Sequence, residues 1–415
     1  YRSNPPYTFV RNPYYPVVDA AGNQLPYIDR VVYQVKAKNM IPIAASNGEI
    51  SFQGRHLSFK DYTDLMGNQQ RNGYRVLHWY SQKSEFTVFP NINRRVEAGK
   101  PETKWKRKFL RDKRFRQALS LALDREKIIE AEYSGQITPA QIAPRPGSRF
   151  YLEGADQKYV EHDPDRANDL LDALGLTQRD RAGYRTFPDG SRMSFFLELN
   201  EFTGAGPAQL LVDDWKKVGV RVTPRMRSRN LFGWERASLE HDLDVWSSGG
   251  FLLPLLDRGL VEGPFCPAYQ NWRRRGGLYG DPKAKETRGC KEPPPGSPVR
   301  TAMELYDRIY MEPDPQRQKD LYHRILGLAS EQCWSINIGT PPPQLMVCDA
   351  DLRNVPETAM YLWTFQSPAN TGPETFYFAD PQTPPGAREQ IREHLREVKP
   401  APHSQTAAGT EAAGT

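Results

Sequence analysis

The sequence predicts an α/β protein in which helices cover mixed β-sheets. Two observations support this class. Segments with helical periodicity alternate with short β-branched segments, and 415 residues with 38% hydrophobic side chains can form two or three domains with their own cores. No apolar run approaches the roughly 18–20 residues of a membrane-spanning helix, which argues against a membrane-embedded protein. The net charge of +6 is a mild excess over so long a chain and is weak evidence for nucleic-acid binding.

Four short strands are expected. Residues 31–35 are β-branched and aromatic, as in a half-buried strand. Residues 193–199 follow the Pro-Asp-Gly turn at 188–190, which predicts one arm of a hairpin. Residues 220–222 come directly after a helix-ending glycine, and residues 243–246 resemble a further short strand.

Five helices are expected among these strands, each at a recognisable start signal. Asp112 is the expected N-cap of the first helix, and Asp124 is the expected N-cap of the second. Asp163 and Asp314 each precede a proline, which combines an N-cap side chain with the residue best suited to the first helical position. Gly206, also followed by proline, opens another helix. After Asp163 apolar residues recur at i, i+3, i+4 and i+7, so one face of that helix is expected to be buried.

Two stretches predict irregular chain. Residues 273–298 are too rich in proline, glycine and charge for regular structure. Residues 400–415 form an Ala/Gly/Thr tail that cannot bury a core. A short charged helix is expected at 387–398, with Ile391 and Leu395 on one side.

The four cysteines allow two interpretations. They are Cys266, Cys290, Cys333 and Cys348, and their spacings match no zinc or redox pattern. Two disulfides, Cys266–Cys290 and Cys333–Cys348, would suit an oxidising compartment. Four free buried thiols are the other interpretation.

Motifs for catalysis and cofactor binding are absent from the sequence. It contains no H-E-x-x-H, G-x-S-x-G or Walker-type G-x-x-x-x-G-K-[ST] segment. Gly204 and Gly206 resemble part of a dinucleotide fingerprint, but Pro207 follows and the third glycine is missing, so helix capping explains them. The seven histidines lack ligand spacing. We therefore expect neither a metal nor a cofactor.

Two kinds of charged cluster could indicate nucleic-acid binding or hydrolysis. For both kinds, a structural role of the charged residues is favoured. The basic, aromatic-rich run at 104–116 could bind phosphates and stack bases, but a helix starts within it, so most of the run is expected to be its solvated approach. The pairs Asp213/Asp214 and Asp242/Asp244 could serve a glycosidase, which needs two carboxylates at a controlled separation. Asp244 lies in an expected strand with Asp242 at its edge or on the opposite face, so the two are expected to diverge.

Five segments carry a family resemblance through their order. They are 12–29 (with N-P-Y-Y and G-N-Q-L-P-Y-I-D), 47–56 (N-G-E-I, then Q-G-R-H), 115–125 (F-R-Q-A-L-S-L-A-L-D-R), 215–220 (W-K-K-V-G-V) and 242–246 (D-L-D-V-W). Together, over roughly residues 10–380, they resemble the family 5 extracellular solute-binding proteins, the dipeptide and oligopeptide receptors of ABC importers. Ser51 stands where that family usually has an acidic residue.

The resemblance implies a two-lobed periplasmic-binding-protein fold, type II-like and of the large peptide-receptor class, with mixed sheets and a hinge. Residues 1–90 would form the remaining part of lobe 1, 91–340 lobe 2, and 341–385 a return to lobe 1. Residues 386–415 would hold the short charged helix and a disordered tail. The chain starts at Tyr1 without an export signal, so we expect it to be N-terminally incomplete.

The function implied by the resemblance is that of a binding protein and not of an enzyme. It would be the substrate-binding component of an ABC transporter, capturing a peptide or other small polar solute in an interlobe cleft for import. The expected partners are the solute and the permease subunits, with no nucleic acid. The protein would be a monomer, periplasmic or extracellular, peripheral to the membrane or anchored through the missing N-terminus. The alternative is an extracytoplasmic hydrolase of glycosidase type that uses a carboxylate pair.

The resemblance also places a ligand site. Its residues would be Trp246, Ser247, Ser248, Gly249, Gly250 and Phe251 of one loop, together with Asn93, Arg55 and His56. Backbone amides freed by the glycines could bond a peptide main chain, and Trp246 or Phe251 could cover a side-chain pocket. The other interpretation of Trp246 is a residue of the lobe core.

One position departs from the peptide receptors. Their loop carries an aspartate, four residues before a proline, that pairs with the α-amino group of the peptide. Counting back from Pro254, this place falls on Gly250, which has no charge to hold an ammonium. Asp257 is the nearby carboxylate that could substitute for it. Other members of the family carry sugars, metal chelates or opines, so the solute class stays open.

Overall fold

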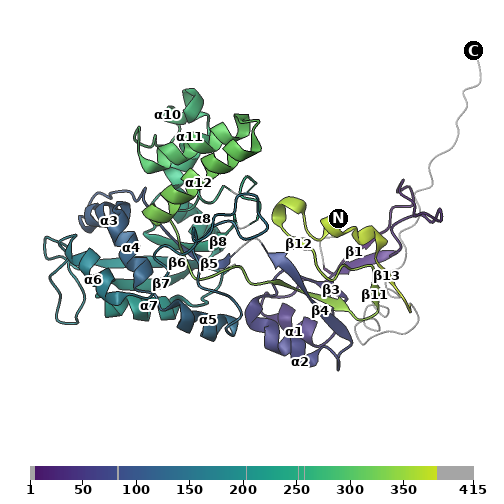
Figure 1. The fold of residues 1–415 in the computed structure, drawn as a ribbon. Coiled ribbons are helices and arrows are strands. Elements are labelled where there is room, and N and C mark those ends of the chain that lie inside the picture. The colour runs from purple at the N-terminus through teal and green to yellow at the C-terminus, as the bar shows by residue number, and fades with distance from the viewer. Residues whose placement is uncertain (1–4, 82–83, 202, 251, 257, 381–415) are drawn as a thin grey trace, which may run out of the picture. The chain divides into compact units, whose positions relative to one another are not determined.

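The computed structural model describes residues 5–81, 84–201, 203–250, 252–256 and 258–380 (Figure 1). The chain forms two compact units, which are described here one at a time. The first unit comprises Tyr1–Trp79, Gln344–Ala359 and Gln366–Thr415, and the second comprises Tyr80–Pro343 and Met360–Phe365. The predicted charged helix and tail at 386–415 lie outside the described residues.

The first unit is built on small antiparallel sheets. Its strands are β1 (Tyr7–Val10), β2 (Arg30–Tyr33), β3 (Phe52–Gln53), β4 (Tyr74–Ser81), β10 (Gln344–Asp349), β11 (Leu352–Arg353) and β13 (Tyr377–Phe378). Its helices are α1 (Met40–Ser46) and α2 (Tyr62–Asn68), with short 3-10 helices at Phe59–Asp61, Ala369–Thr371 and Pro373–Thr375. Strand β10 pairs antiparallel with both β3 and β4, while β1 pairs with β2 and β11 with β13. Trp79, Leu65 and Val347 are fully buried and form part of the core.

Strand β2 confirms the strand predicted at 31–35, but the expected half-burial is wrong. Val31 and Tyr33 are 45% and 58% exposed. Within the described residues β2 pairs only with β1, in a two-stranded ribbon. A half-buried strand needs a packed layer behind it, and two strands alone do not supply one.

The second unit contains a five-stranded mixed sheet. Its strands are β5 (Ser84–Pro90), β6 (Ser194–Asn200), β7 (Arg221–Arg227), β8 (Leu243–Ser248) and β9 (Ile336–Asn337), in the order β7-β6-β8-β5-β9. Strand β6 runs parallel to β7 and β8, and β5 runs antiparallel to β8 and β9. The short strand β12 (Met360–Tyr361) pairs in parallel with the end of β4.

Ten α-helices are described in the second unit. They are α3 (Glu102–Arg111), α4 (Lys113–Leu121), α5 (Arg125–Tyr133), α6 (Pro164–Asp172), α7 (Ala208–Lys217), α8 (Arg229–Ala237), α9 (Pro267–Arg274), α10 (Lys283–Glu286), α11 (Pro298–Met311) and α12 (Pro315–Gln332), with 3-10 helices at Gly277–Tyr279 and Trp363–Phe365. Helices α11 and α12 lie side by side (Figure 1) and enclose a hydrophobic cluster that includes Tyr306, Ile325 and Trp334.

The predicted helix starts are confirmed. The carboxylates of Asp112, Asp124, Asp163 and Asp314 accept backbone N–H bonds of 2.7–3.0 Å from the first turns of α4, α5, α6 and α12. Each side chain thereby satisfies a donor that has no partner inside the helix. Helix α7 begins two residues after Gly206, as expected.

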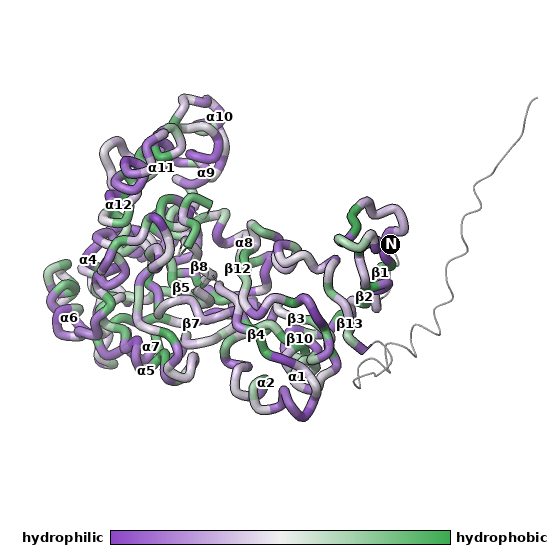
Figure 2. Tube along the Cα trace, turned by 45° about the vertical axis from the view of Figure 1, so that its right-hand side comes forward, coloured by the Kyte–Doolittle hydropathy of each residue, from purple (hydrophilic) through white to green (hydrophobic). Residues whose placement is uncertain are grey.

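The two faces of the five-stranded sheet differ in polarity. Side chains alternate along a strand, so Leu197 and Leu243 share one face and Glu198 and Asp244 share the other. Figure 2 shows hydrophobic and hydrophilic residues interspersed along the described part of the chain. Helix α4 packs against the apolar face, where the rings of Phe115 and Phe195 are 5.2 Å apart.

Three sequence predictions need correction. Strand β6 is not a hairpin arm, because both of its partners are parallel and the preceding turn is closed only by an isolated bridge between Thr186 and Arg192. The stretch 273–298 is not wholly irregular, since α9 ends in it and α10 lies within it. The basic run at 104–116 is not a solvated approach. Most of it forms α3, in which Lys106 and Phe109 are buried.

The four cysteines, all within the described residues, are free, so the disulfide interpretation is wrong. Cys266, Cys333 and Cys348 are buried, and Cys290 is half-buried. Burial raises the pKa of the Cys266 thiol to about 12 and the pKa of Cys333 and Cys348 to about 11. These three thiols are therefore protonated at neutral pH and poorly nucleophilic. Spacing along the chain carried no information about the separation of the sulfur atoms.

Candidate functional site

One edge of the five-stranded sheet gathers polar side chains. Strands β6, β8 and β9 end at this edge and β5 begins there, because β5 runs antiparallel to β8 and β9. Asn200, Ser248 and Asn337 are the last residues of their strands. Ligands of open α/β sheets bind outside the carboxyl ends of the strands, so this edge is the candidate site of the second unit.

Buried hydrogen bonds fix this edge. The Thr87 hydroxyl lies 2.7 Å from Asn337 Oδ1 and 2.8 Å from Ser248 Oγ, so it donates to the amide and accepts from the serine. Asn337 Nδ2 donates to the carbonyl oxygens of Ala140 at 2.9 Å and Gly339 at 2.7 Å. Thr87, Ser248 and Asn337 are at most 4% exposed. The side chain of Ser248 therefore ties β8 to its neighbouring strand β5.

Trp246 lies two residues before Ser248 and is held by helix α8. Its indole stacks on Phe232 with ring centroids 5.7 Å apart and an interplanar angle of 23°. The Arg236 guanidinium lies 5.3 Å from the indole centroid, and that of Arg229 lies 5.5 Å from it. Trp246 is only partly buried and also packs against the hydrophobic cluster of α11 and α12. It therefore combines a core contact with a partly exposed ring.

The loop after β8 is glycine-rich. Gly249 and Gly250 are buried, while Ser247 is half-buried. Gly250 has φ +102°, in the region that favours glycine because it has no Cβ. Two residues predicted from the sequence to contact a ligand, Phe251 and Asp257, lie outside the described residues.

Asn93 lies at the opposite edge of the sheet. It follows β5 at the end where Pro90 pairs with Leu243, the first residue of β8. Its Oδ1 accepts the backbone N–H groups of Ala268 and Tyr269 at 3.0 and 3.2 Å, which caps α9. Its buried Nδ2 has no hydrogen-bond partner among the described residues.

Arg55 and His56 belong to the first unit, in the turn after β3. Arg55 is exposed, and His56 is half-buried with φ +66°. Burial lowers the pKa of His56, and the nearby charges of Arg55 and Lys38 lower it further. This turn is therefore cationic at its arginine, with a neutral imidazole at physiological pH.

The carboxylates weighed for hydrolysis, Asp242 directly before β8 and Asp244 within it, are engaged in ion pairs. Asp242 accepts from Arg94 Nε at 2.8 Å and from Lys106 Nζ at 2.7 Å, with all three side chains at most 5% exposed. Asp244 lies 2.7 Å from Arg236 Nε and 3.6 Å from His241 Nε2. Both aspartates are thus held by cationic partners, and Asp244 Oδ1 has no hydrogen-bond partner among the described residues.

Two more carboxylates in the unit are also paired. Asp214, 1% exposed, accepts the backbone N–H of Asp124 and pairs with Lys217 at 2.7 Å. Burial raises the pKa of Glu198, which pairs with Arg225 and, at 3.1 Å, with Arg227.

Sequence reasoning missed the cations of this network. Lys106 precedes Phe109 by three residues and Leu110 by four, so it shares their buried face of α3, a spacing visible in the sequence. Arg94 and Arg236 pair with residues 148 and 8 positions away. The pair of Arg94 with Asp242 could not be predicted from any local sequence pattern.

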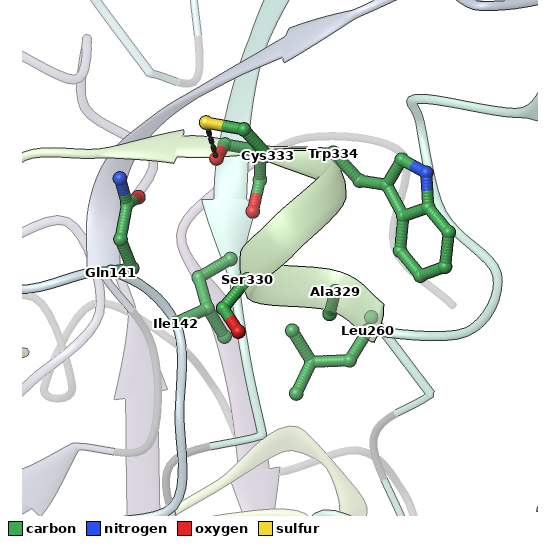
Figure 3. A pocket seen from close by; sticks show the side chains of 9 residues that line it. Gln141, Ile142, Leu260, Ala329, Ser330, Cys333 and Trp334 are labelled. Carbon is green, nitrogen blue, oxygen red and sulfur yellow. Dashed lines mark hydrogen bonds between the residues drawn. The ribbon is translucent and has the colours of Figure 1, made fainter. Parts of the chain in front are cut away.

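A small cavity in the second unit is too small for a solute. It measures about 20 Å³, enough for roughly one water molecule, whereas ligand pockets measure roughly 300–1,000 Å³. Figure 3 shows Gln141, Ile142, Leu260, Cys333 and Trp334 around it.

Comparison with known proteins identifies the class and then the family. The fold is that of the extracellular solute-binding proteins. A solved OppA oligopeptide-binding protein matches with a TM-score of 0.63 and 32% identity, over 90% of this chain and 60% of that one. Residues 3–255 match the bacterial extracellular solute-binding proteins, family 5 (Middle), and the chain belongs to this family. The recognition and the fold class expected from the sequence are confirmed.

The names of two further relatives mention sugars. The solved structure of MelB from Agrobacterium fabrum C58, in complex with stachyose, matches with a TM-score of 0.65 and 19% identity over 90% of this chain and 55% of that one. The periplasmic alpha-galactoside-binding protein of Rhizobium meliloti is 28% identical over 227 residues, 51% of this chain and 32% of the relative. This chain therefore spans about a third of that curated relative.

Among the described residues, no group of three or more His, Cys, Asp or Glu side chains is placed so that it could hold a metal ion. No helix in the described part of the chain is long and apolar enough to cross a membrane.

Proposed function

We propose that this chain is the substrate-binding component of an ABC importer and captures a small polar solute, not that it breaks bonds as an enzyme. The observation that carries the proposal is the family 5 match over residues 3–255. The relatives reported above are named as binding proteins for oligopeptides or galactosides. The carboxylates that a hydrolase would need pair with arginine and lysine side chains, which supports binding over hydrolysis.

The proposed contacts lie at the carboxyl edge of the sheet, at Asn93 beyond the opposite edge, and in the first unit. Trp246 supplies an aromatic surface, and residues 247–250 supply backbone amides, while Phe251, outside the described residues, stays a prediction. Arg55 and His56 of the first unit and Asn93 complete the set expected from the sequence. For Ser248 and Asn93, whose side chains are used inside the protein, the contribution is indirect, through the strand end and the helix that they fix.

The solute class follows from charge. The place of the aspartate that anchors a peptide amino group in the peptide receptors is Gly250. Asp242, Asp244 and Glu198 of the same sheet each have a cationic partner, which already balances the charge that an ammonium would need. A neutral polyhydroxylated solute, or a peptide held by its main chain, fits these residues better than a peptide held by its free amino group.

The organisation of the chain in two lobes remains part of the proposal. Residues 1–90 and 341–385 would form lobe 1, and residues 91–340 lobe 2. Support comes from the two compact units, whose boundaries fall after Trp79 and before Gln344. The partners would be importer permease subunits, and the protein would be a monomer outside the cytoplasmic membrane, either free or anchored to it.

A thermal-shift screen tests the proposed function. The protein, as encoded in full, is heated with a panel of oligosaccharides and a panel of oligopeptides. Because a solute that binds only the folded state stabilises it by mass action, we expect at least one class to raise the Tm in a concentration-dependent manner. No shift with any member of either panel would contradict the proposal.

A further inference from the structure

Helix α8 presents a ring and a guanidinium side by side toward strand β8. Phe232 and Arg236 are four residues apart, so they lie one turn apart on the same face of the helix. The Arg236 guanidinium lies 4.7 Å from the centroid of the Phe232 ring and 5.3 Å from that of Trp246. The indole of Trp246 therefore packs against the Phe232 ring and the Arg236 guanidinium, and the Arg229 guanidinium lies at a similar distance, 5.5 Å.

The position of Arg236 is fixed by the strand that carries Trp246. Arg236 Nε lies 2.7 Å from Asp244 Oδ2, and Asp244 is 1% exposed. Asp244 and Trp246 are two residues apart on β8, so their side chains project from the same face of the sheet. His241 Nε2 approaches the same carboxylate oxygen, but only to 3.6 Å. The ion pair and the ring contact thus form one connected unit, Asp244–Arg236–Trp246.

We propose that Arg236 is a positioning residue that, through its ion pair with Asp244, fixes the indole of Trp246 at the carboxyl end of β8. Phe232 restrains the ring by stacking alone, and stacking permits sliding in the plane of the rings. A guanidinium anchored to a buried carboxylate adds a directional restraint. The consequence for solute affinity rests on the proposed function, whereas the restraint on the indole does not.

Fluorine NMR reads the indole directly. The protein is labelled with 5-fluorotryptophan, which reports on all eight tryptophans, and the Trp246 resonance is assigned by its loss in Trp246→Phe. We expect Arg236→Gln to shift or broaden this resonance and to leave the other tryptophan resonances in place. Arg236→Lys keeps a charge for Asp244 but loses the planar cation, so it should restore the resonance only in part.

Arg221→Gln is the matched control. Arg221 has nearly the same side-chain exposure as Arg236, 26% against 24%. It also pairs with an aspartate, Asp180 at 3.0 Å, and lies over a ring, Tyr184 at 4.0 Å. The control therefore loses the same kinds of contact in the same unit without touching Trp246. We expect it to leave the Trp246 resonance unchanged.

Calorimetry with stachyose and with tetra-alanine then measures the functional consequence. For whichever probe binds the wild type, we expect about tenfold weaker binding by Arg236→Gln and unchanged binding by Arg221→Gln, measured at a temperature at which both variants are folded. The Tm of Arg236→Gln should be the lower of the two, because its partner Asp244 is 1% exposed and Asp180 is 31% exposed. An unchanged Trp246 resonance in Arg236→Gln would overturn the inference, and so would a shifted resonance with wild-type affinity. If neither probe binds the wild type, the proposed function loses support. The positioning role of Arg236 is then decided by the Trp246 resonance in Arg236→Gln compared with Arg221→Gln.

Discussion

Replacing Lys106 by methionine tests the buried charge network of the second unit. The Lys106 ammonium lies 2.7 Å from Asp242 Oδ2, and its side chain is 5% exposed. Removing one partner of a buried ion pair costs about 3–5 kcal/mol, because the other charge stays buried. Asp242 would keep Arg94 at 2.8 Å and the backbone N–H of Phe196 at 3.0 Å. We therefore expect a loss near the lower end, about 3 kcal/mol of unfolding free energy.

Urea unfolding followed by tryptophan fluorescence measures this loss. The control is Lys104→Met, an exposed lysine on the same helix, for which a surface substitution should change the unfolding free energy by less than about 0.5 kcal/mol. If the two variants were equally stable, Lys106 would be a solvated lysine, as the basic run in the sequence first indicated, and the description of α3 would be wrong.

Two further predictions concern His241 and the cysteines. Burial lowers the pKa of His241 to about 4, so the unfolded state binds the proton more tightly, and the unfolding free energy should fall as the pH drops from 6.5 to 4, by roughly 3 kcal/mol. Urea unfolding at pH 7 and 4.5 should show a smaller fall in His241→Gln, and an equal fall in the variant would contradict the burial. Cys290, the half-buried thiol, should be the one that reacts with a thiol reagent in the folded protein, and Cys290→Ser should abolish the reaction. A second thiol reacting at a similar rate would contradict this.

Local signals explain how far the fold could be predicted. Asp163 and Asp314 begin helices because a carboxylate caps backbone donors wherever the neighbouring residues permit a helix. Helix α3 was missed because the charges of the basic run conceal its buried face, in which a lysine stands where an apolar residue is expected. The sequence cannot show that this lysine meets Asp242, which lies 136 residues away.

The candidate site could be predicted only in part for a similar reason. Trp246 and the glycines after it mark a strand end, and the structure places them at the carboxyl edge of the sheet. The ring and guanidinium that hold Trp246 come from another element, α8, and only the packed structure brings them together. Asn93 lies at the other edge, because strand direction is a property of pairing and not of local sequence. The roles of these residues in solute binding stay predictions.

Isothermal titration calorimetry on the protein as encoded in full tests the central claim most directly, with the solutes that raise its Tm. The account predicts saturable binding of one solute per chain, weakened at least about tenfold in Trp246→Ala. Trp234→Ala is the control, since Trp234 is 61% exposed on the same helix that holds Trp246. The account would be contradicted if wild-type protein gave no binding heat with either oligosaccharides or oligopeptides, or if both tryptophan variants bound as tightly as wild type.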